Sequence, residues 1–131
     1  MARTRRTEEH TVTESMLARS MGSGDLPVLA TPALAALFEG AAAALAREYL
    51  EEGRTTVGTK LNLEHTAPTP CGAKLTVEAE LTGREGRLFR FRLTARDEAG
   101  PVASCEHERV SVNPERFLQK AQARGKASDE A

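Results

Sequence analysis

Apolar positions recur at helical spacing across residues 31–50, and the rest of the chain is expected to surround this helix. Pro32 has the φ angle that a first helical turn requires, and the Thr31 hydroxyl can cap a free N–H group of that turn. Alanine fills most positions between the larger members of the pattern, which are Leu34, Leu37, Phe38, Ala41, Leu45 and Tyr49. A helix that is apolar on almost every side is typical of one enclosed by other structure, so we expect it to be buried.

Four segments after the helix alternate between apolar and polar positions, which is the period of a β-strand. They lie at residues 55–66, 75–81, 89–95 and 102–113, with turn residues between them. This rhythm predicts an antiparallel meander with one face in the core and one face in water. Residues 10–13, before the helix, are predicted to form one further short strand.

Three polar side chains fall on strand faces that are expected to meet the helix. In the segment 55–66, the positions on one face are Val57, Thr59, Leu61, Leu63 and His65. His65 is therefore predicted to point the same way as the apolar side chains. In the segment 102–113, His107 and Arg109 share a face with small apolar residues, so both should look inward.

The remaining segments lack a regular pattern. Residues 2–9 are charged and predicted to be frayed, while residues 16–27 contain Gly and Pro and are predicted to form a mobile loop that acts as a lid. Residues 114–122 are predicted to form a short closing helix. We therefore predict a single domain over residues 1–124, followed by a disordered tail over 125–131.

A long helix with about five antiparallel strands is an α+β layout, in which a curved sheet wraps the helix. One helix cannot cover both faces of such a sheet, and an exposed edge strand invites pairing with another chain. We therefore predict at least a homodimer made by edge-to-edge extension of the sheet, with a dimer of dimers as a further option.

Composition narrows the classes of partner. The chain has 131 residues, enough for one domain with its own core. With 18 basic and 19 acidic residues its net charge is −1, which indicates neither nucleic-acid binding nor a basic membrane-binding face. No apolar run approaches the ~20 residues of a membrane span, and no apolar segment follows the N-terminal arginines as in a signal peptide. A cytoplasmic protein is expected.

The two cysteines, Cys71 and Cys105, lie far apart and outside any metal-ligand spacing. We therefore predict neither a disulfide framework nor a metal site, and a reducing compartment fits this composition.

Glu39 is the only ionisable side chain between Thr31 and Arg47, and Gly40 follows it without a side chain to exclude a ligand. A carboxylate in a buried helix is costly unless a partner supports it, and His65 on the facing strand is the candidate partner. A structural interpretation stays open in each case. Glu39 can be a paired structural carboxylate, Thr31 an ordinary cap, and His65 a satisfied histidine at a strand end.

Four segments together carry a resemblance to a known family. They are VLATPALAALFEGAAAALA from Val28, VGTKLNLEHTAPTPCG from Val57, VEAELTGREGRLFRFRLTARDEAG from Val77 and HERVSV from His107. They resemble the hotdog-fold acyl-CoA thioesterases of the fluoroacetyl-CoA thioesterase type. The marks are a Thr eight residues before a Glu on the helix, a GT start to the next strand, an HTA-TP-G segment closing it and a late HER triplet.

The resemblance implies a hotdog fold and hydrolysis of an acyl-CoA, with coenzyme A as part of the substrate and no other cofactor or metal. It implies that Thr31, Glu39 and His65 match the catalytic positions of the family, and that Gly58 and Arg109 match residues that contact the substrate. His107 is expected to be structural rather than catalytic. Arg109 can hold a carboxyl or phosphate group of the substrate, or can pair with a carboxylate in the sheet.

These residue types fit thioester hydrolysis, which needs a carboxylate nucleophile or a base that activates water, plus donors for the oxyanion. Glu39 is suited to be that nucleophile or base, His65 to protonate the leaving thiolate, and Thr31 to orient substrate, water or His65. Eight residues of straight helix rise ~12 Å, so Thr31 and Glu39 of one chain cannot touch. Either His65 and the substrate bridge them, or the partner subunit supplies one of them. We favour the second option and predict a site at the dimer interface.

One departure from the family pattern bears on the substrate. Thioesterases selective for fluoroacetyl groups have phenylalanines in the segment before the helix, whereas here nothing aromatic precedes Phe38. We therefore expect a different or broader small or medium acyl group. Two alternatives stay open, namely a non-catalytic acyl-CoA-binding hotdog module and an acyl-thioester hydratase or dehydratase.

Overall fold

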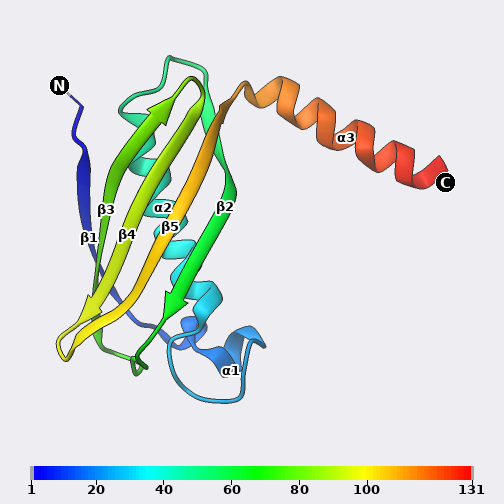
Figure 1. Cartoon of the computed structure of the whole chain (residues 1–131). Helices are drawn as coiled ribbons and strands as arrows, with labels where there is room; N and C mark the ends of the chain where they lie inside the picture. Colours follow the sequence, from blue (N-terminus) through cyan, green and yellow to red (C-terminus); the bar gives the residue numbers. More distant parts are fainter. Residues whose placement is uncertain (1, 131) are drawn as a thin grey trace.

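A five-stranded antiparallel sheet lies against one long helix, α2 (Thr31–Arg47), in the computed structural model of the chain (Figure 1). The structure describes residues 2–130, with side chains described up to residue 126. The strands are β1 (Arg5–Thr11), β2 (Thr55–His65), β3 (Lys74–Glu85), β4 (Leu88–Asp97) and β5 (Gly100–Val112). Their order in the sheet is β1-β3-β4-β5-β2, so β1 and β2 are the two edges. The predicted α+β fold, with a helix packed in a curved sheet of five strands, is confirmed.

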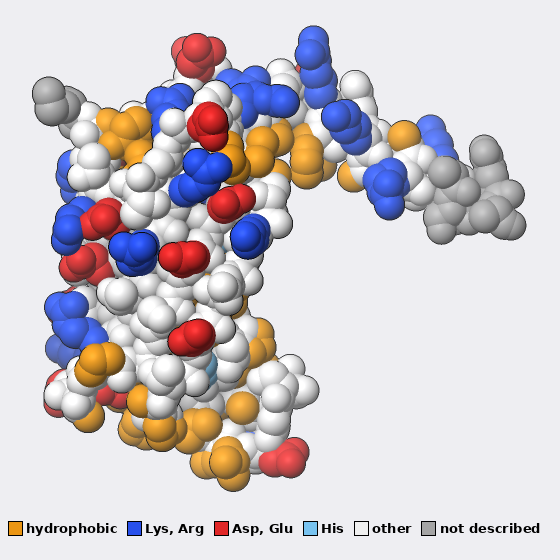
Figure 2. Space-filling view, viewed as in Figure 1, with side chains coloured by type: hydrophobic (Ala, Val, Ile, Leu, Met, Phe, Trp, Pro, Cys, Tyr) orange, Lys and Arg blue, Asp and Glu red, His pale blue; other side chains and the backbone are white. Residues whose placement is uncertain are grey.

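The core lies between α2 and the inner face of the sheet. Leu34, Phe38 and Leu45 are fully buried on one side of the helix, four or seven residues apart, which is the spacing of one helical face. Alternate residues of β3 and β4 meet them, with Leu75, Val77, Ala79, Phe89, Phe91 and Leu93 all at most 2% exposed. The opposite face of the sheet carries charged side chains, as Figure 2 shows. The apolar alternation in the sequence therefore identified the core face of both strands.

The N-terminal strand is longer than predicted. Residues 5–9 belong to β1 and pair with β3, where Arg5 lies opposite Glu80. Arg5 contacts both Glu78 and Glu80, at 3.3 and 2.6 Å. The prediction that residues 2–9 are frayed is wrong from Arg5 onward, because main-chain pairing and cross-strand charges form this strand without an apolar pattern.

The predicted loop before the helix is tied together by hydrogen bonds. It contains the short helices η1 (Glu14–Met16) and α1 (Ala18–Met21). Its two arms meet where Leu17 pairs with Leu29, and both of these side chains are buried. The loop therefore forms a compact cover over the start of α2 (Figure 1).

Helix α2 begins at Thr31, the predicted cap residue, and therefore one residue earlier than predicted. Ala30 is the N-cap residue and Thr31 is the first helical residue, and the Thr31 hydroxyl makes no capping bond. The prediction that Thr31 caps the helix is therefore wrong, which leaves its hydroxyl free for another partner. The helix ends at Arg47 rather than at residue 50.

A β-bulge between Gly58 and Lys60 changes which residues of β2 face the helix. Gly58 pairs with Arg109, but Leu61, three residues later, pairs with His107. Because a bulge adds one residue, Thr56 and Gly58 face inward before it, and the positions that face inward after it are Leu61, Leu63 and His65. The prediction that Val57 and Thr59 share this face is wrong.

A last helix, α3 (Pro114–Glu130), projects away from the sheet (Figure 1). It is longer than the predicted segment 114–122, and it also covers most of the predicted disordered tail over 125–131, of which residue 131 lies outside the described residues. Its described side chains after Pro114 are exposed, so this helix adds no side chain to the core. Within residues 2–130, no helix combines the length and the apolar character that crossing a membrane requires.

Candidate active site

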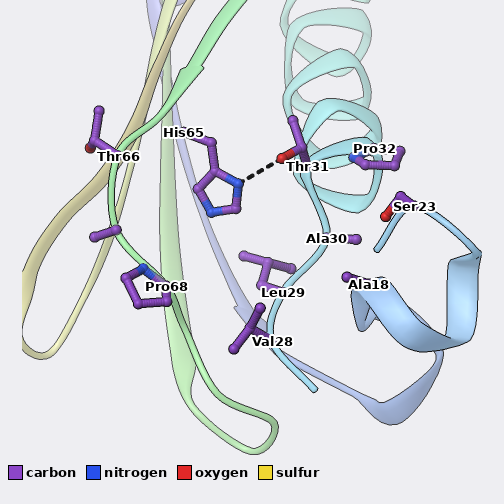
Figure 3. A pocket seen from close by; sticks show the side chains of 11 residues that line it. Ala18, Ser23, Val28, Leu29, Ala30, Thr31, Pro32, His65, Thr66 and Pro68 are labelled. Atoms are coloured by element: carbon purple, nitrogen blue, oxygen red, sulfur yellow. Dashed lines mark hydrogen bonds between the residues drawn. The ribbon is translucent and has the colours of Figure 1, made fainter. Parts of the chain in front are cut away.

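The Thr31 hydroxyl bonds to His65 where the start of α2 meets the end of β2 (Figure 3). The distance from Thr31 Oγ1 to His65 Nδ1 is 2.9 Å. The pair lies in the wall of an open pocket of about 360 Å³. The other residues lining this pocket are Ala18, Ser23, Val28, Leu29, Ala30, Pro32, Thr66, Ala67 and Pro68. Thr31 and His65 are therefore a hydrogen-bonded polar pair in a pocket whose other polar side chains are Ser23 and Thr66.

The second ring nitrogen of His65, Nε2, is buried and has no hydrogen-bond partner in the described part of the chain. Most buried polar atoms in proteins are paired, because leaving one unpaired costs free energy. Since Nδ1 is already bound to Thr31, Nε2 is the atom of this pair that is left to accept or donate a proton.

Glu39 lies on the same helix, two turns beyond Thr31, and faces Arg109. Arg109 Nη1 is 3.5 Å from Glu39 Oε2, and the Glu39 side chain is 46% exposed. Arg109 is 7% exposed, and its guanidinium is held by Thr56, with Nε donating to the hydroxyl at 2.9 Å and Nη2 to the carbonyl at 3.0 Å. The fixed Arg109 cation therefore contacts one side of the Glu39 carboxylate, and the other side of this carboxylate is exposed.

His107 forms a hydrogen bond with Arg109 and helps to hold it in place. Its Nδ1 lies 2.7 Å from the carbonyl oxygen of Lys60, which can only accept, so Nδ1 carries the proton. Its Nε2 then accepts from Arg109 Nη1 at 3.2 Å. Burial lowers the pKa of His107, and the nearby Arg109 charge lowers it further. The ring is therefore neutral at pH 7, which agrees with the predicted structural role.

The state of His107 makes stability depend on pH. The unfolded chain takes up a proton at the ordinary histidine pKa of about 6.5, whereas the folded chain does so only at lower pH. Protonation therefore favours the unfolded state, and the free energy of unfolding should fall as pH drops below about 6.5. In His107→Gln this part of the slope should vanish, as urea unfolding between neutral pH and about pH 5.5 would measure. Parallel curves for the two proteins would contradict the neutral ring.

Gly58 lets the carboxylate of Glu39 approach the strand. A Cβ atom at this position would lie 2.5 Å from Glu39 Oε2 and 3.3 Å from Arg109 Nη1. Any larger residue would therefore push the carboxylate out of its place beside the guanidinium. The structure gives Gly58 this steric role, whereas its contact with substrate stays a prediction.

The five predicted site residues thus form two groups within one chain. Thr31 and His65 form one, while Glu39, Gly58 and Arg109 form the other. Within the single chain, the Glu39 side chain is half exposed and contacts Arg109 rather than His65, because among the described residues no strand lies beyond β2 to cover this side of the helix. The straight-helix separation of ~12 Å between Thr31 and Glu39 fits this division.

The structure shows two residues that hold Arg109 and whose contacts with it the sequence did not reveal. Thr56 orients Arg109, but the bulge at residues 58–60 hid its inward orientation. The inward orientation of His107 was predicted from strand alternation, yet only the structure shows that it touches Arg109.

Neither cysteine belongs to the site. Both are free thiols, and burial raises the pKa of Cys105 to about 11, so it stays protonated at neutral pH. Among residues 2–130, no group of three or more His, Cys, Asp or Glu side chains is arranged to hold a metal ion.

One helix packed against an antiparallel sheet of order β1-β3-β4-β5-β2 is the layout of the hotdog-fold thioesterases. A sequence model of the fluoroacetyl-CoA-specific thioesterase family (FlK) matches residues 12–115. The chain belongs to this family. The prediction of a hotdog-fold acyl-CoA thioesterase, a thioester hydrolase, is confirmed at this level.

Three relatives illustrate the match. The fluoroacetyl-CoA thioesterase of Streptantibioticus cattleyicolor is 39% identical over 93 residues, which span 71% of this chain and 67% of the relative. A crystal structure of an FlK mutant in complex with fluoroacetate and CoA is 32% identical, with a TM-score of 0.82 over 89% of this chain and 98% of that one. A hypothetical protein of Thermus thermophilus, described as a thioesterase superfamily member, is 25% identical with a TM-score of 0.85 over 97% and 96% of the two chains.

Proposed function

We propose that this protein hydrolyses a small or medium acyl-CoA thioester to the free acid and CoA. The observation that carries the proposal is the bond between Thr31 and His65 in the pocket wall, which leaves Nε2 of the ring without a partner. An imidazole oriented in this way is suited to protonate a leaving thiolate. The complex of a related FlK with CoA supports the choice of an acyl-CoA as substrate.

Glu39 is proposed to begin the reaction by one of two routes. As a general base it takes a proton from water, and the hydroxide attacks the carbonyl carbon before the C–S bond breaks. As a nucleophile it attacks the carbonyl carbon itself, forming an anhydride that water then hydrolyses. In both routes the thiolate leaves with a proton from His65. The N–H groups at the start of α2 are suited to stabilise the oxyanion.

The two groups of residues are proposed to meet across a dimer interface, with Thr31 and His65 from one subunit and Glu39 from the other. Three features of the free edge support this arrangement. Strand β2 has no neighbour on its outer side, Leu61 on that strand is 37% exposed, and the Glu39 side chain is half exposed. Pairing of two β2 edges would cover all three.

The acyl group is proposed to be broader than fluoroacetyl. The pocket wall before α2 is built from Val28, Leu29 and Ala30, and no aromatic residue lines the pocket. Such a wall has no ring to select for a fluorinated group. A preference for fluoroacetyl-CoA over acetyl-CoA of less than about tenfold in kcat/KM is expected.

A panel of acyl-CoAs, followed by release of free thiol, tests the function. Hydrolysis of at least one small or medium member supports it. Binding of acyl-CoA without thiol release would instead identify a non-catalytic binding module. Loss of enoyl absorbance from an unsaturated thioester, without thiol release, would identify a hydratase.

Gly58→Ala is expected to lower kcat by roughly tenfold or more, because the new methyl group displaces the Glu39 carboxylate that it would overlap. Steady-state kinetics on the best acyl-CoA would measure the change. Gly83→Ala is a matched control, since Gly83 also lies in a strand and its new Cβ would meet only Arg90 at 3.8 Å or more. Equal kcat values for the Gly58 variant and the wild type would contradict the steric role.

A further inference from the structure

A pocket of about 270 Å³ lies where α3 leaves the sheet, well apart from Thr31 and His65. The residues lining it are Arg54, Arg87, Val112, Asn113, Arg116, Phe117 and Lys120. Four of the seven are cations and none is an acid, in a chain whose net charge is −1. In Figure 2, Lys and Arg side chains gather along α3 and the adjoining end of the sheet. The pocket is therefore strongly positive in a nearly neutral protein.

The cations come from separate elements that are fixed relative to one another. Arg54 is half-buried and donates from Nε to the Ser111 hydroxyl at 2.7 Å and from Nη2 to the Ser111 carbonyl at 3.1 Å. The Ser111 N–H in turn donates to the carbonyl of Arg87 at 2.9 Å. The backbone N–H of Arg116 donates to the Asn113 side chain at 3.1 Å, which fixes the first turn of α3.

Arg116 and Lys120 lie four residues apart on α3, so they are neighbours on one face of the helix. Both line the pocket together with Arg54 and Arg87. Among the side chains described, none of these four forms an ion pair with an acid, whereas seven arginines elsewhere do, namely Arg3, Arg5, Arg6, Arg19, Arg90, Arg92 and Arg109. Like charges held together without counterions repel one another, and a bound anion would relieve this repulsion.

A second hollow of about 310 Å³ extends the positive region. It shares Arg54 and Arg87 with the first pocket and adds Arg84, and its only acid among the described residues is Glu51. The Arg84 guanidinium is stacked over Phe89, with 4.8 Å to the ring centroid. The two hollows can therefore accommodate more than one negatively charged group.

We infer that this basic pocket binds the phosphate groups at the nucleotide end of the CoA substrate. The inference rests on the proposed function, and it assigns a second subsite to the same ligand. Arg54 directly precedes β2 and lies four residues before Gly58, which corresponds to ~13 Å of extended chain. Glu39 faces Gly58, so the pantetheine arm of CoA would connect the carboxylate to the cations and leave the outer edge of β2 free to pair with a second subunit. Arginine and lysine are the side chains best suited to bind phosphate.

The test compares two substrates that share the reacting thioester. Acyl-CoA carries the nucleotide, whereas acyl-pantetheine lacks it. In the double variant Arg116→Gln, Lys120→Gln, the KM for acyl-CoA should rise by roughly tenfold while kcat and the KM for acyl-pantetheine stay unchanged, because only binding remote from the reaction is lost. Both residues are exposed on a helix that projects from the domain, so the variant should fold normally.

The matched control is the double variant Arg124→Gln, Lys126→Gln, which removes two charges from the same helix outside the pocket. It should leave both KM values unchanged. Equal rises for the two substrates, no rise for either, or an equal effect of the control would overturn the inference. If no acyl-CoA is hydrolysed, calorimetry with adenosine bisphosphate as the probe still tests the pocket. Binding that the first variant loses and the control keeps would support it, whereas no binding, or binding of pyrophosphate alone, would overturn it.

Discussion

Glu39→Gln is expected to reduce kcat by at least ~100-fold, the usual scale for loss of a catalytic base. Glutamine keeps the size and shape of the side chain but can neither accept a proton from water nor attack a carbonyl carbon. The change should leave the fold intact, because the Glu39 side chain is 46% exposed and packs on one side only. Steady-state thiol release, with circular dichroism to confirm folding, would measure the effect.

Glu48→Gln is the control for this experiment. Glu48 follows the last turn of α2 and forms an exposed ion pair with Arg3 at 3.3 Å, so its replacement removes the same charge far from the pocket. Activity should stay close to that of the wild type. A Glu39→Gln protein with unchanged kcat would exclude Glu39 as nucleophile and as base, and the ion pair with Arg109 would then be structural.

The position of Arg109 separates these two roles further. A buried guanidinium that loses its carboxylate becomes a less well compensated charge, so Glu39→Gln should also cost some stability. If Glu39 is only structural, the Glu39→Gln protein should lose stability and keep its activity. If Glu39 is catalytic, the kcat of Glu39→Gln should fall far more than the small change in the free energy of unfolding would explain. This is the result we expect.

The long helix and the central strands could be predicted from the sequence, because the apolar residues that recur at a regular spacing in them are also the residues that are buried. Helix α2 and strands β3 and β4 each bury one regular face, and the register shifts of the two strands, at Leu81/Gly83 and Ala95/Arg96, lie at the ends of their buried stretches. Strand β1 lacks such a face, since polar residues occupy both of its sides and cross-strand charges with β3 stabilise it. Its start could therefore not be found from hydrophobicity.

The site was predictable in its residues but not in its contacts. The bulge at residues 58–60 reverses the face of β2. Gly58 is a local signal for it, since an isolated glycine inside a strand often marks a bulge, but the alternation of apolar residues alone does not show the reversal. The exposure of Glu39 follows from the strand order, in which β2 has no outer neighbour, and strand order is a long-range property. The contact between Thr31 and His65 likewise depends on where the end of β2 meets α2.

His65→Ala is expected to lower kcat on a scale similar to Glu39→Gln, because the leaving thiolate loses its proton donor and Thr31 loses its partner. His107→Ala is the matched histidine variant, and its effect on kcat should be mild, since both ring nitrogens of His107 are already bound within the protein. Comparable losses in the two variants would mean that His65 acts only through packing.

The two inactive variants together test where the site is built. If Thr31 and His65 of one subunit act with Glu39 of the other, a mixed dimer of Glu39→Gln and His65→Ala subunits contains one site with neither change and one with both. Unfolding and refolding the two proteins together at equal amounts should then restore about a quarter of wild-type activity, because half of the dimers are mixed and each has one intact site. If all three residues acted within one subunit, every site would carry one change, and the mixture would stay as inactive as its parts. The distance along α2 and the open side of Glu39 make recovery the expected result.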